Sequence, residues 1–136
     1  MNNLLTAIMT KCSGSALSDD VGGRIYLDQA EQGAQLPYIV FFIVSDVPSH
    51  TFTEDFEDVL IQFSMFSDSD GAVEITTMYG HLKALFDEAI FAVTSSTLVW
   101  FRRQNLVTNV EDFTTATAAE TVKHWAVDYE VKLSTN

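Results

Sequence analysis

Apolar residues recur along this chain with two different periods, and the positions at which the period changes predict its elements. Residues 3–12 place apolar side chains at helical spacing, which predicts a short amphipathic helix. Residues 72–93 repeat this spacing along one stripe and predict a long helix, with Asp70 as a candidate N-cap. A helix with a single apolar face is expected to lie across a sheet.

The rest of the chain is dominated by alternating apolar and polar residues, which is the strand period. The pattern predicts a short edge strand at 24–27 and main strands at 38–46, 58–67, 97–110 and 121–133. The alternation is imperfect around Arg102–Arg103, which predicts a bulge. The run from Tyr38 to Val44 is continuously apolar and predicts a strand covered on both faces. The segments with neither period are predicted as loops or single turns: 18–23, 28–36, 47–57 and 111–120.

This order of elements predicts the fold class. A chain of 136 residues is the size of one domain, so residues 1–136 are expected to form a single unit. Successive strands usually pair with their neighbours in sequence. We therefore expect an α+β domain with a mostly antiparallel sheet of about four main strands and two helices packed on one face.

Charge and cysteine content narrow the range of partners. Nineteen Asp and Glu against seven Lys and Arg give a formal net charge of −12, which argues against general nucleic-acid binding and against an anionic membrane surface. The longest apolar run is too short to span a bilayer, and the first residues do not resemble a signal peptide. The single cysteine, Cys12, lies on the predicted helical stripe, where a buried free thiol is expected in a reducing cytoplasm.

The sequence offers little catalytic chemistry. Its three histidines, His50, His81 and His124, lack the spacing of a metal motif, and neither a phosphate-binding glycine loop nor a nucleophile elbow occurs. No catalytic, metal-binding or cofactor-binding residue is therefore expected, and the chain is not expected to be an enzyme. A remote alternative is a small hydrolase or isomerase that uses Asp46 and His50, because both lie near a predicted strand end.

Two charged clusters are candidates for subunit contacts. Glu54, Asp55, Glu57 and Asp58 fall in a predicted loop, which is either a solvated acidic loop or a contact surface for a neighbouring subunit. Arg102 and Arg103 are adjacent on a predicted strand and should face opposite ways. One of them could meet an acidic loop on another copy; the alternative is a structural salt bridge or an exposed cation on the strand.

Four segments, taken in order, carry a resemblance to a known family. They are Gly22-Gly23-Arg24-Ile25-Tyr26, Gln32-Gly33-x-x-Leu36-Pro37-Tyr38-Ile39-Val40, Ser45-Asp46-x-Pro48-x-His50 and His124-Trp125-x-x-Asp128-Tyr129-Glu130-Val131. Together with the first helix and the long central helix, this set resembles the tail completion, or tail terminator, proteins of long-tailed bacteriophages. The resemblance covers most of the chain.

The resemblance implies a structural protein of the virion that has no cofactor and performs no reaction. Such proteins form a hexameric ring at the head-proximal end of the tail, assembled in the host cytoplasm. The ring stops polymerisation of the tail tube protein and meets the head connector or a head-completion protein. DNA would pass through the ring without sequence-specific binding, and no membrane is involved. The alternative within the same particle is another neck adaptor or a tail-tube subunit.

Overall fold

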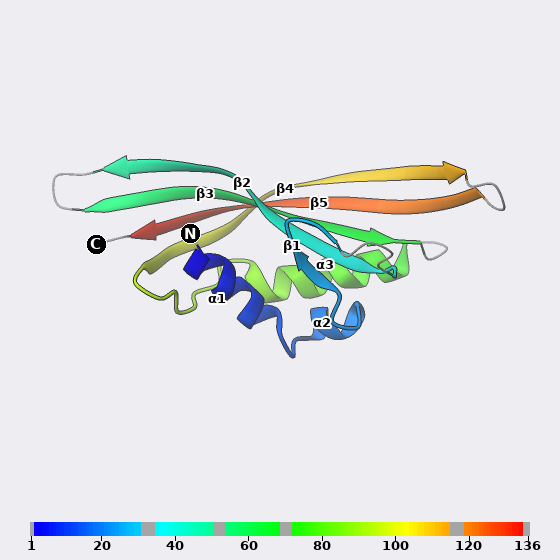
Figure 1. Ribbon diagram of the computed structural model, residues 1–136, viewed down its shortest axis with the longest axis horizontal. Helices are drawn as coiled ribbons and strands as arrows, with labels where there is room; N and C mark the ends of the chain where they lie inside the picture. The colour runs from blue at the N-terminus through cyan, green and yellow to red at the C-terminus, as the bar shows by residue number, and fades with distance from the viewer. Residues whose placement is uncertain (1, 31–34, 51–53, 69–71, 115–118, 135–136) are drawn as a thin grey trace.

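The computed structural model describes residues 2–30, 35–50, 54–68, 72–114 and 119–134. These residues form a twisted sheet of five strands with three helices on one side (Figure 1). The elements in chain order are α1 (Asn2–Cys12), α2 (Ala16–Asp20), β1 (Ile25–Leu27), β2 (Tyr38–His50), β3 (Asp55–Ser67), α3 (Val73–Phe86), β4 (Thr97–Thr114) and β5 (Ala119–Ser134). The α+β class and the mostly antiparallel sheet are confirmed.

The sheet has the strand order β1-β2-β3-β5-β4. The four long strands pair antiparallel, and the short β1 runs parallel to β2 over the register Ile25↔Ile39 to Leu27↔Phe41. The predicted bulge near Arg102–Arg103 is confirmed as a register shift between Arg103 and Asn105. A second shift in β4 follows Leu98, and β2 has one between Ile43 and Ser45. Bulges of this kind bend and twist a strand locally.

The core lies between the sheet and the helices. Side chains from β2, β3, β4 and β5 that point towards the helices alternate with outward ones, as the strand period requires. An aromatic cluster forms the centre: Phe41, Phe63, Phe86, Phe101 and Tyr129, with ring centroids of successive neighbours 5.0–5.6 Å apart. Leu4, Ile8 and Cys12 of α1 are buried at the edge of the same core. The strand predicted at 121–133 is confirmed, and its side chains in this core are Val127, Tyr129, Val131 and Leu133.

The strands are longer than the sequence pattern predicted. The expected loop at 47–57 is wrong for most of its length, because β2 continues to His50 and β3 begins at Asp55. The expected connection at 111–120 is also strand, up to Thr114 and again from Ala119. The sequence pattern misses these extensions because polar residues interrupt the apolar alternation in both segments. In the structure both ends of the sheet project beyond the helices (Figure 1).

The long helix is shorter than predicted. It ends at Phe86, and Glu88 adopts a positive φ of 53°, which interrupts helical geometry. The Glu88 N–H then donates to the Phe101 carbonyl oxygen at 2.9 Å, so the chain attaches to β4. Ile90, expected on the apolar stripe, is 79% exposed. The predicted cap at Asp70 lies outside the described residues.

One helix was missed. α2 overlaps the segment 18–23, which was predicted as a loop or single turn. Its N-cap is Ser15, whose hydroxyl accepts a hydrogen bond from the Ser18 N–H at 3.2 Å. The prediction that the apolar run of β2 is covered on both faces holds only at its beginning. Val40 and Phe41 are buried, but Val44 is exposed.

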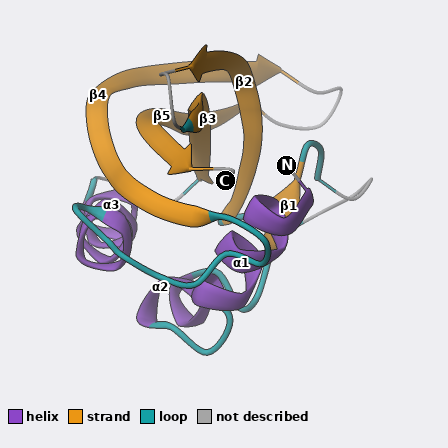
Figure 2. Ribbon diagram, turned by 90° about the vertical axis from the view of Figure 1, so that its left-hand side faces the viewer, coloured by secondary structure: helices purple, strands orange, loops and turns teal. Residues whose placement is uncertain are grey.

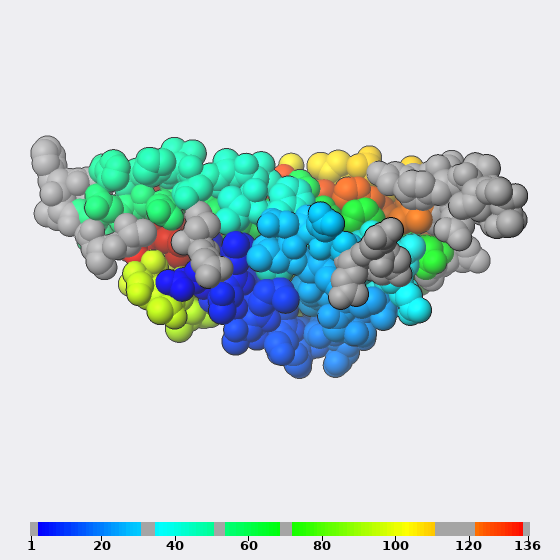
Figure 3. Space-filling model, viewed as in Figure 1, coloured from blue at the N-terminus to red at the C-terminus, as the bar shows by residue number. Residues whose placement is uncertain are grey.

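The sheet turns over along its length. At one end of Figure 1, β2 forms the border of the sheet away from the helices, and at the other end β4 forms it. The end-on view of Figure 2 shows β2 and β4 curving around opposite sides of the inner strands. This reversal is the right-handed strand twist accumulated over strands of 13 to 18 residues. The resulting body is elongated, with α1 and α2 bulging from the middle of one side (Figure 3).

Candidate assembly surfaces

The best-organised polar cluster joins the end of α3 to the sheet. Asp87, the C-cap of α3, accepts a hydrogen bond from the Tyr129 hydroxyl at 2.6 Å and from the Arg103 Nε at 3.2 Å. Arg103 also donates from Nη1 to the Tyr79 hydroxyl at 2.5 Å. Burial, followed by the hydrogen bond to Asp87, raises the pKa of Tyr129 above its ordinary value. These groups satisfy one another, so we interpret the cluster as a structural clamp.

Arg102 and Arg103 point to opposite faces of the sheet. Arg103 lies opposite Tyr129 and faces α3, whereas Arg102 lies opposite Glu130 on the face without helices. The Arg102 guanidinium stacks over the Trp100 ring at 4.3 Å and lies 3.7 Å from Glu88. Both arginines therefore make ion pairs within the subunit, which is the structural alternative that the sequence left open. A contact of either arginine with another subunit stays a prediction.

Sequence reasoning missed the basic and aromatic neighbours of Arg102. The Lys132 ammonium lies 5.0 Å from the Trp100 ring and 4.8 Å from the Phe56 ring, so cations and rings alternate across β4, β5 and β3. The Lys132 ammonium is also 3.7 Å from Asp58. These residues point to the same outer face of neighbouring strands. That relation can be recognised only when the pairing of the strands is known, so the sequence alone did not show it. The cluster covers the open face at one end of the sheet.

The four acidic candidates lie on or beside β3, near the β2–β3 turn. Asp55 accepts a hydrogen bond from His50 at 2.8 Å, and Glu57 lies opposite Pro48. Asp55 and Glu57 share the helix-side face of the strand, while Asp58 faces the other way, towards Lys132. Glu54 precedes the strand. Asp58 therefore lies on the other face of the sheet from Asp55 and Glu57, and the four acidic residues do not form one cluster.

The remote catalytic pair is not brought together. Asp46 and His50 both lie on β2, four positions apart on an extended strand, which separates their α-carbons by about 13 Å. The partner of His50 is Asp55. Within the described ranges, no three His, Cys, Asp or Glu side chains are grouped to hold a metal ion. The same ranges contain no helix that is long and apolar enough to cross a membrane.

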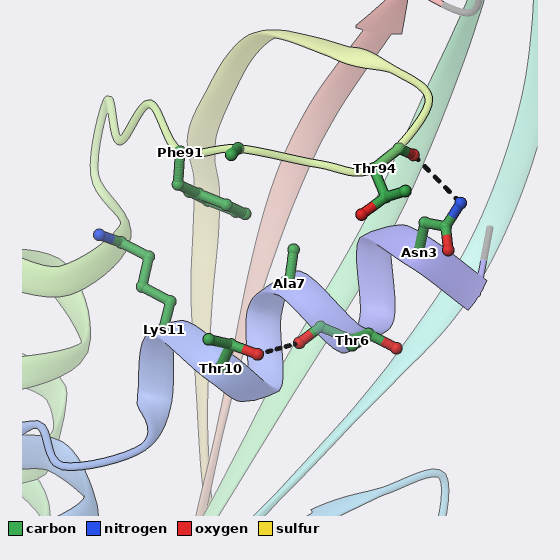
Figure 4. Close-up of a pocket in the computed structure, with 8 residues that line it drawn as sticks. Asn3, Thr6, Ala7, Thr10, Lys11, Phe91 and Thr94 are labelled. Carbon is green, nitrogen blue, oxygen red and sulfur yellow. Dashed lines mark hydrogen bonds between the residues drawn. The ribbon is translucent and has the colours of Figure 1, made fainter.

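One hollow among the described residues is an open groove between α1 and the segment after α3 (Figure 4). Its volume is about 390 Å³. The Asn3 amide donates to the Thr94 carbonyl oxygen at 3.1 Å at one end, and Lys11 lies 5.5 Å from the Phe91 ring at the other. The lining between them is mostly threonine and alanine: Thr6, Ala7, Thr10 and Ala92. The groove holds no buried cluster of ionisable groups, so it has the character of a contact surface.

Cys12 is the one thiol in the chain, and burial raises its pKa to about 12. The reactive thiolate is then roughly 1 part in 10,000 at pH 8, against about a quarter for an ordinary cysteine. We expect iodoacetamide to alkylate the native protein roughly a thousandfold more slowly than a free cysteine, and the urea-unfolded protein at the ordinary rate. Mass spectrometry of timed samples measures both rates. Rapid alkylation of the folded chain would contradict the burial of Cys12.

These features define a class of protein. Its best-organised polar cluster is structural, and its exposed apolar side chains lie mainly on β2 and β4, on α1 and on the segment after α3. This combination is typical of a subunit that acts by contact within an assembly.

The chain belongs to the family of the tail completion protein gp17, whose model matches residues 4–133. Its fold is similar to that of a chain in the virion of a native gene transfer agent particle, with a TM-score of 0.74. The two sequences are 13% identical, and the match covers 96% of this chain and 94% of the other. No curated protein matches the chain. The family resemblance inferred from the sequence is confirmed, and the chain is a structural protein of the bacteriophage virion tail.

Proposed function

We propose that this protein terminates the tail tube. Copies of the chain form a closed ring, expected to be a hexamer, on the head-proximal end of the tube. The ring stops addition of further tube subunits and offers its other surface to the head connector or a head-completion protein. The observation that carries the proposal is the family match over residues 4–133, and the likeness in fold to a chain of a gene transfer agent virion supports it.

Termination has a simple physical requirement. The terminating subunit must bind the tube end on one surface and must not reproduce that binding surface on the other. A ring closes when copies meet through two different surfaces and the rotation between them returns to the start. An elongated domain with helices on one side and strand borders on the other offers two such different surfaces.

The role requires no chemistry. A terminator acts by shape, and the described residues supply structural polar contacts in place of a reactive constellation. We propose accordingly that the protein is not an enzyme. The acidic residues Glu54, Asp55, Glu57 and Asp58, with Arg102 and Arg103, remain proposed subunit contacts.

Electron microscopy of the purified protein tests this function. We expect short closed rings of one size at high protein concentration, and no long polymers. When the rings are added to polymerising tube protein from the same phage, tube length should stop increasing. Long tubes formed by this protein alone would identify a tube subunit instead. Rings that bind the connector but leave tube growth unchanged would identify a neck adaptor.

A further inference from the structure

Two strands have borders that no other described strand covers. β1 pairs with β2 only as far as Phe41, so the β2 border from Phe42 to His50 is free within the described part of the chain. β4 is the last strand of the sheet. On its outer border, the Phe101 carbonyl oxygen accepts a hydrogen bond from the Glu88 N–H. Free strand borders present unpaired backbone groups, which natural proteins usually cover.

Because the sheet turns over, both free borders face the same side of the molecule. In Figure 1 they lie at opposite ends of the side away from the helices, and Figure 3 shows them on the surface. We call this the strand-border side, made of β2 Phe42–His50 and β4 Arg103–Val110. We call the opposite side, made of α1, α2 and residues 88–94, the helix side.

Exposed apolar side chains are present on both sides. Val44 and Val47 lie on the free border of β2, and Val107 and Val110 on that of β4. On the helix side, Met9 and Ile90 are exposed. Two strand borders that face the same way can both meet the borders of one second copy only after a half turn, which gives a closed pair. Contact between the two opposite sides repeats from copy to copy.

The charges of Asp46 and Lys11 favour the same contact between opposite sides of two copies. Asp46 is exposed on the free border of β2 and has no ion pair among the described residues. Lys11 is half-buried at one end of the groove beside α1, where its ammonium contacts the Phe91 ring and likewise has no carboxylate partner in the described ranges (Figure 4). In a chain with a net charge of −12, an unpaired lysine beside a groove is a favourable place for an acidic side chain.

We propose that the strand-border side of one copy packs on the helix side of the next, with Asp46 at the Lys11 end of the groove. The second copy of the chain is thus the occupant of this groove. The contact covers the free border of β2 with a neighbouring helix, buries exposed valines and pairs two charges that have no partner within the subunit. This inference rests on the proposed ring and specifies its subunit interface.

Charge reversal tests the contact in the full-length protein. Lys11→Glu and Asp46→Lys should each lower the association constant between copies roughly tenfold or more, because each places like charges together. The double variant restores opposite charges, so its association should return to within a few-fold of the wild type. Sedimentation velocity over a range of protein concentrations measures the fraction in rings.

Lys83→Glu is the matched control. Lys83 is also half-buried, also lies over an aromatic ring, that of Tyr79 at 4.5 Å, and also lacks a carboxylate partner among the described residues. It should assemble like the wild type, and circular dichroism melts of all variants check that each is folded. A Lys11→Glu variant that assembles normally, or a double variant no better than either single one, would overturn this contact. Wild-type protein that remains monomeric at every concentration would contradict the ring itself.

Discussion

Phe86→Ala is expected to lower the free energy of unfolding by about 3–5 kcal/mol, the usual cost of removing a fully buried aromatic side chain. Phe86 is 0% exposed and is the last residue of α3. Its ring centroid lies 5.0 Å from that of Phe63 and 5.1 Å from that of Phe101, so the substitution leaves a cavity between the helix and the sheet. Urea unfolding followed by circular dichroism measures the change.

Ile90→Ala is the control, because the sequence pattern placed Ile90 on the same apolar stripe as Phe86. The structure places it beyond the end of the helix with 79% exposure. Its substitution should change the free energy of unfolding by no more than about 0.5 kcal/mol, as is usual at the surface. Equal costs at the two positions would mean that the helix continues past Phe86, as the pattern alone predicted.

Asp87→Ala is expected to cost about 2–3 kcal/mol, mainly because the fully buried Tyr129 would lose the acceptor of its hydroxyl proton. The ion pair with Arg103 adds less, since the Arg103 and Asp87 side chains are 37% and 32% exposed and solvent screens the interaction. Asp87→Asn keeps an oxygen that can accept from Tyr129 and should be markedly less destabilising. The same urea titration compares the two variants.

A double-mutant cycle isolates the Asp87–Tyr129 hydrogen bond. If Tyr129→Phe is made first, no hydroxyl is left without an acceptor, so the later Asp87→Ala change should cost clearly less than it does in the wild type. Asp58→Ala serves as a reference for a peripheral ion pair, with Lys132 3.7 Å away, and should cost under about 1 kcal/mol. Additive costs for Asp87 and Tyr129 would show that the clamp is not a coupled unit.

The sequence pattern correctly predicted the elements that bury an apolar face. It mispredicted the ends of these elements, where the side chains are no longer buried. The alternation of β5 and the stripe of α3 as far as Phe86 follow directly from the need to cover the core. The ends of the helix and strands depend on local backbone events, such as the positive φ at Glu88, and on strand pairing in polar segments. Neither leaves a periodic signal in a single sequence.

The candidate contact residues were likewise predictable in part. Adjacent positions on a strand point to opposite faces, so the separation of Arg102 from Arg103 was predictable. The partner of Arg103 was not, because Asp87 is 16 positions away and is placed by the end of a helix whose length was mispredicted. The proposed contact between Lys11 and Asp46 could not be predicted from the sequence, because it joins residues of two different copies of the chain.

The twist of the sheet also limits how these molecules can aggregate. Stacked β-aggregates need flat, in-register sheets whose faces and borders fit the next copy over their whole length. Here the sheet twists so strongly that the same face points in different directions at the two ends of the molecule. A second copy could therefore stack on this face over only a short part of its length. The same coiling that exposes two strand borders therefore protects a freshly synthesised subunit from amyloid-like stacking before its proper neighbours arrive.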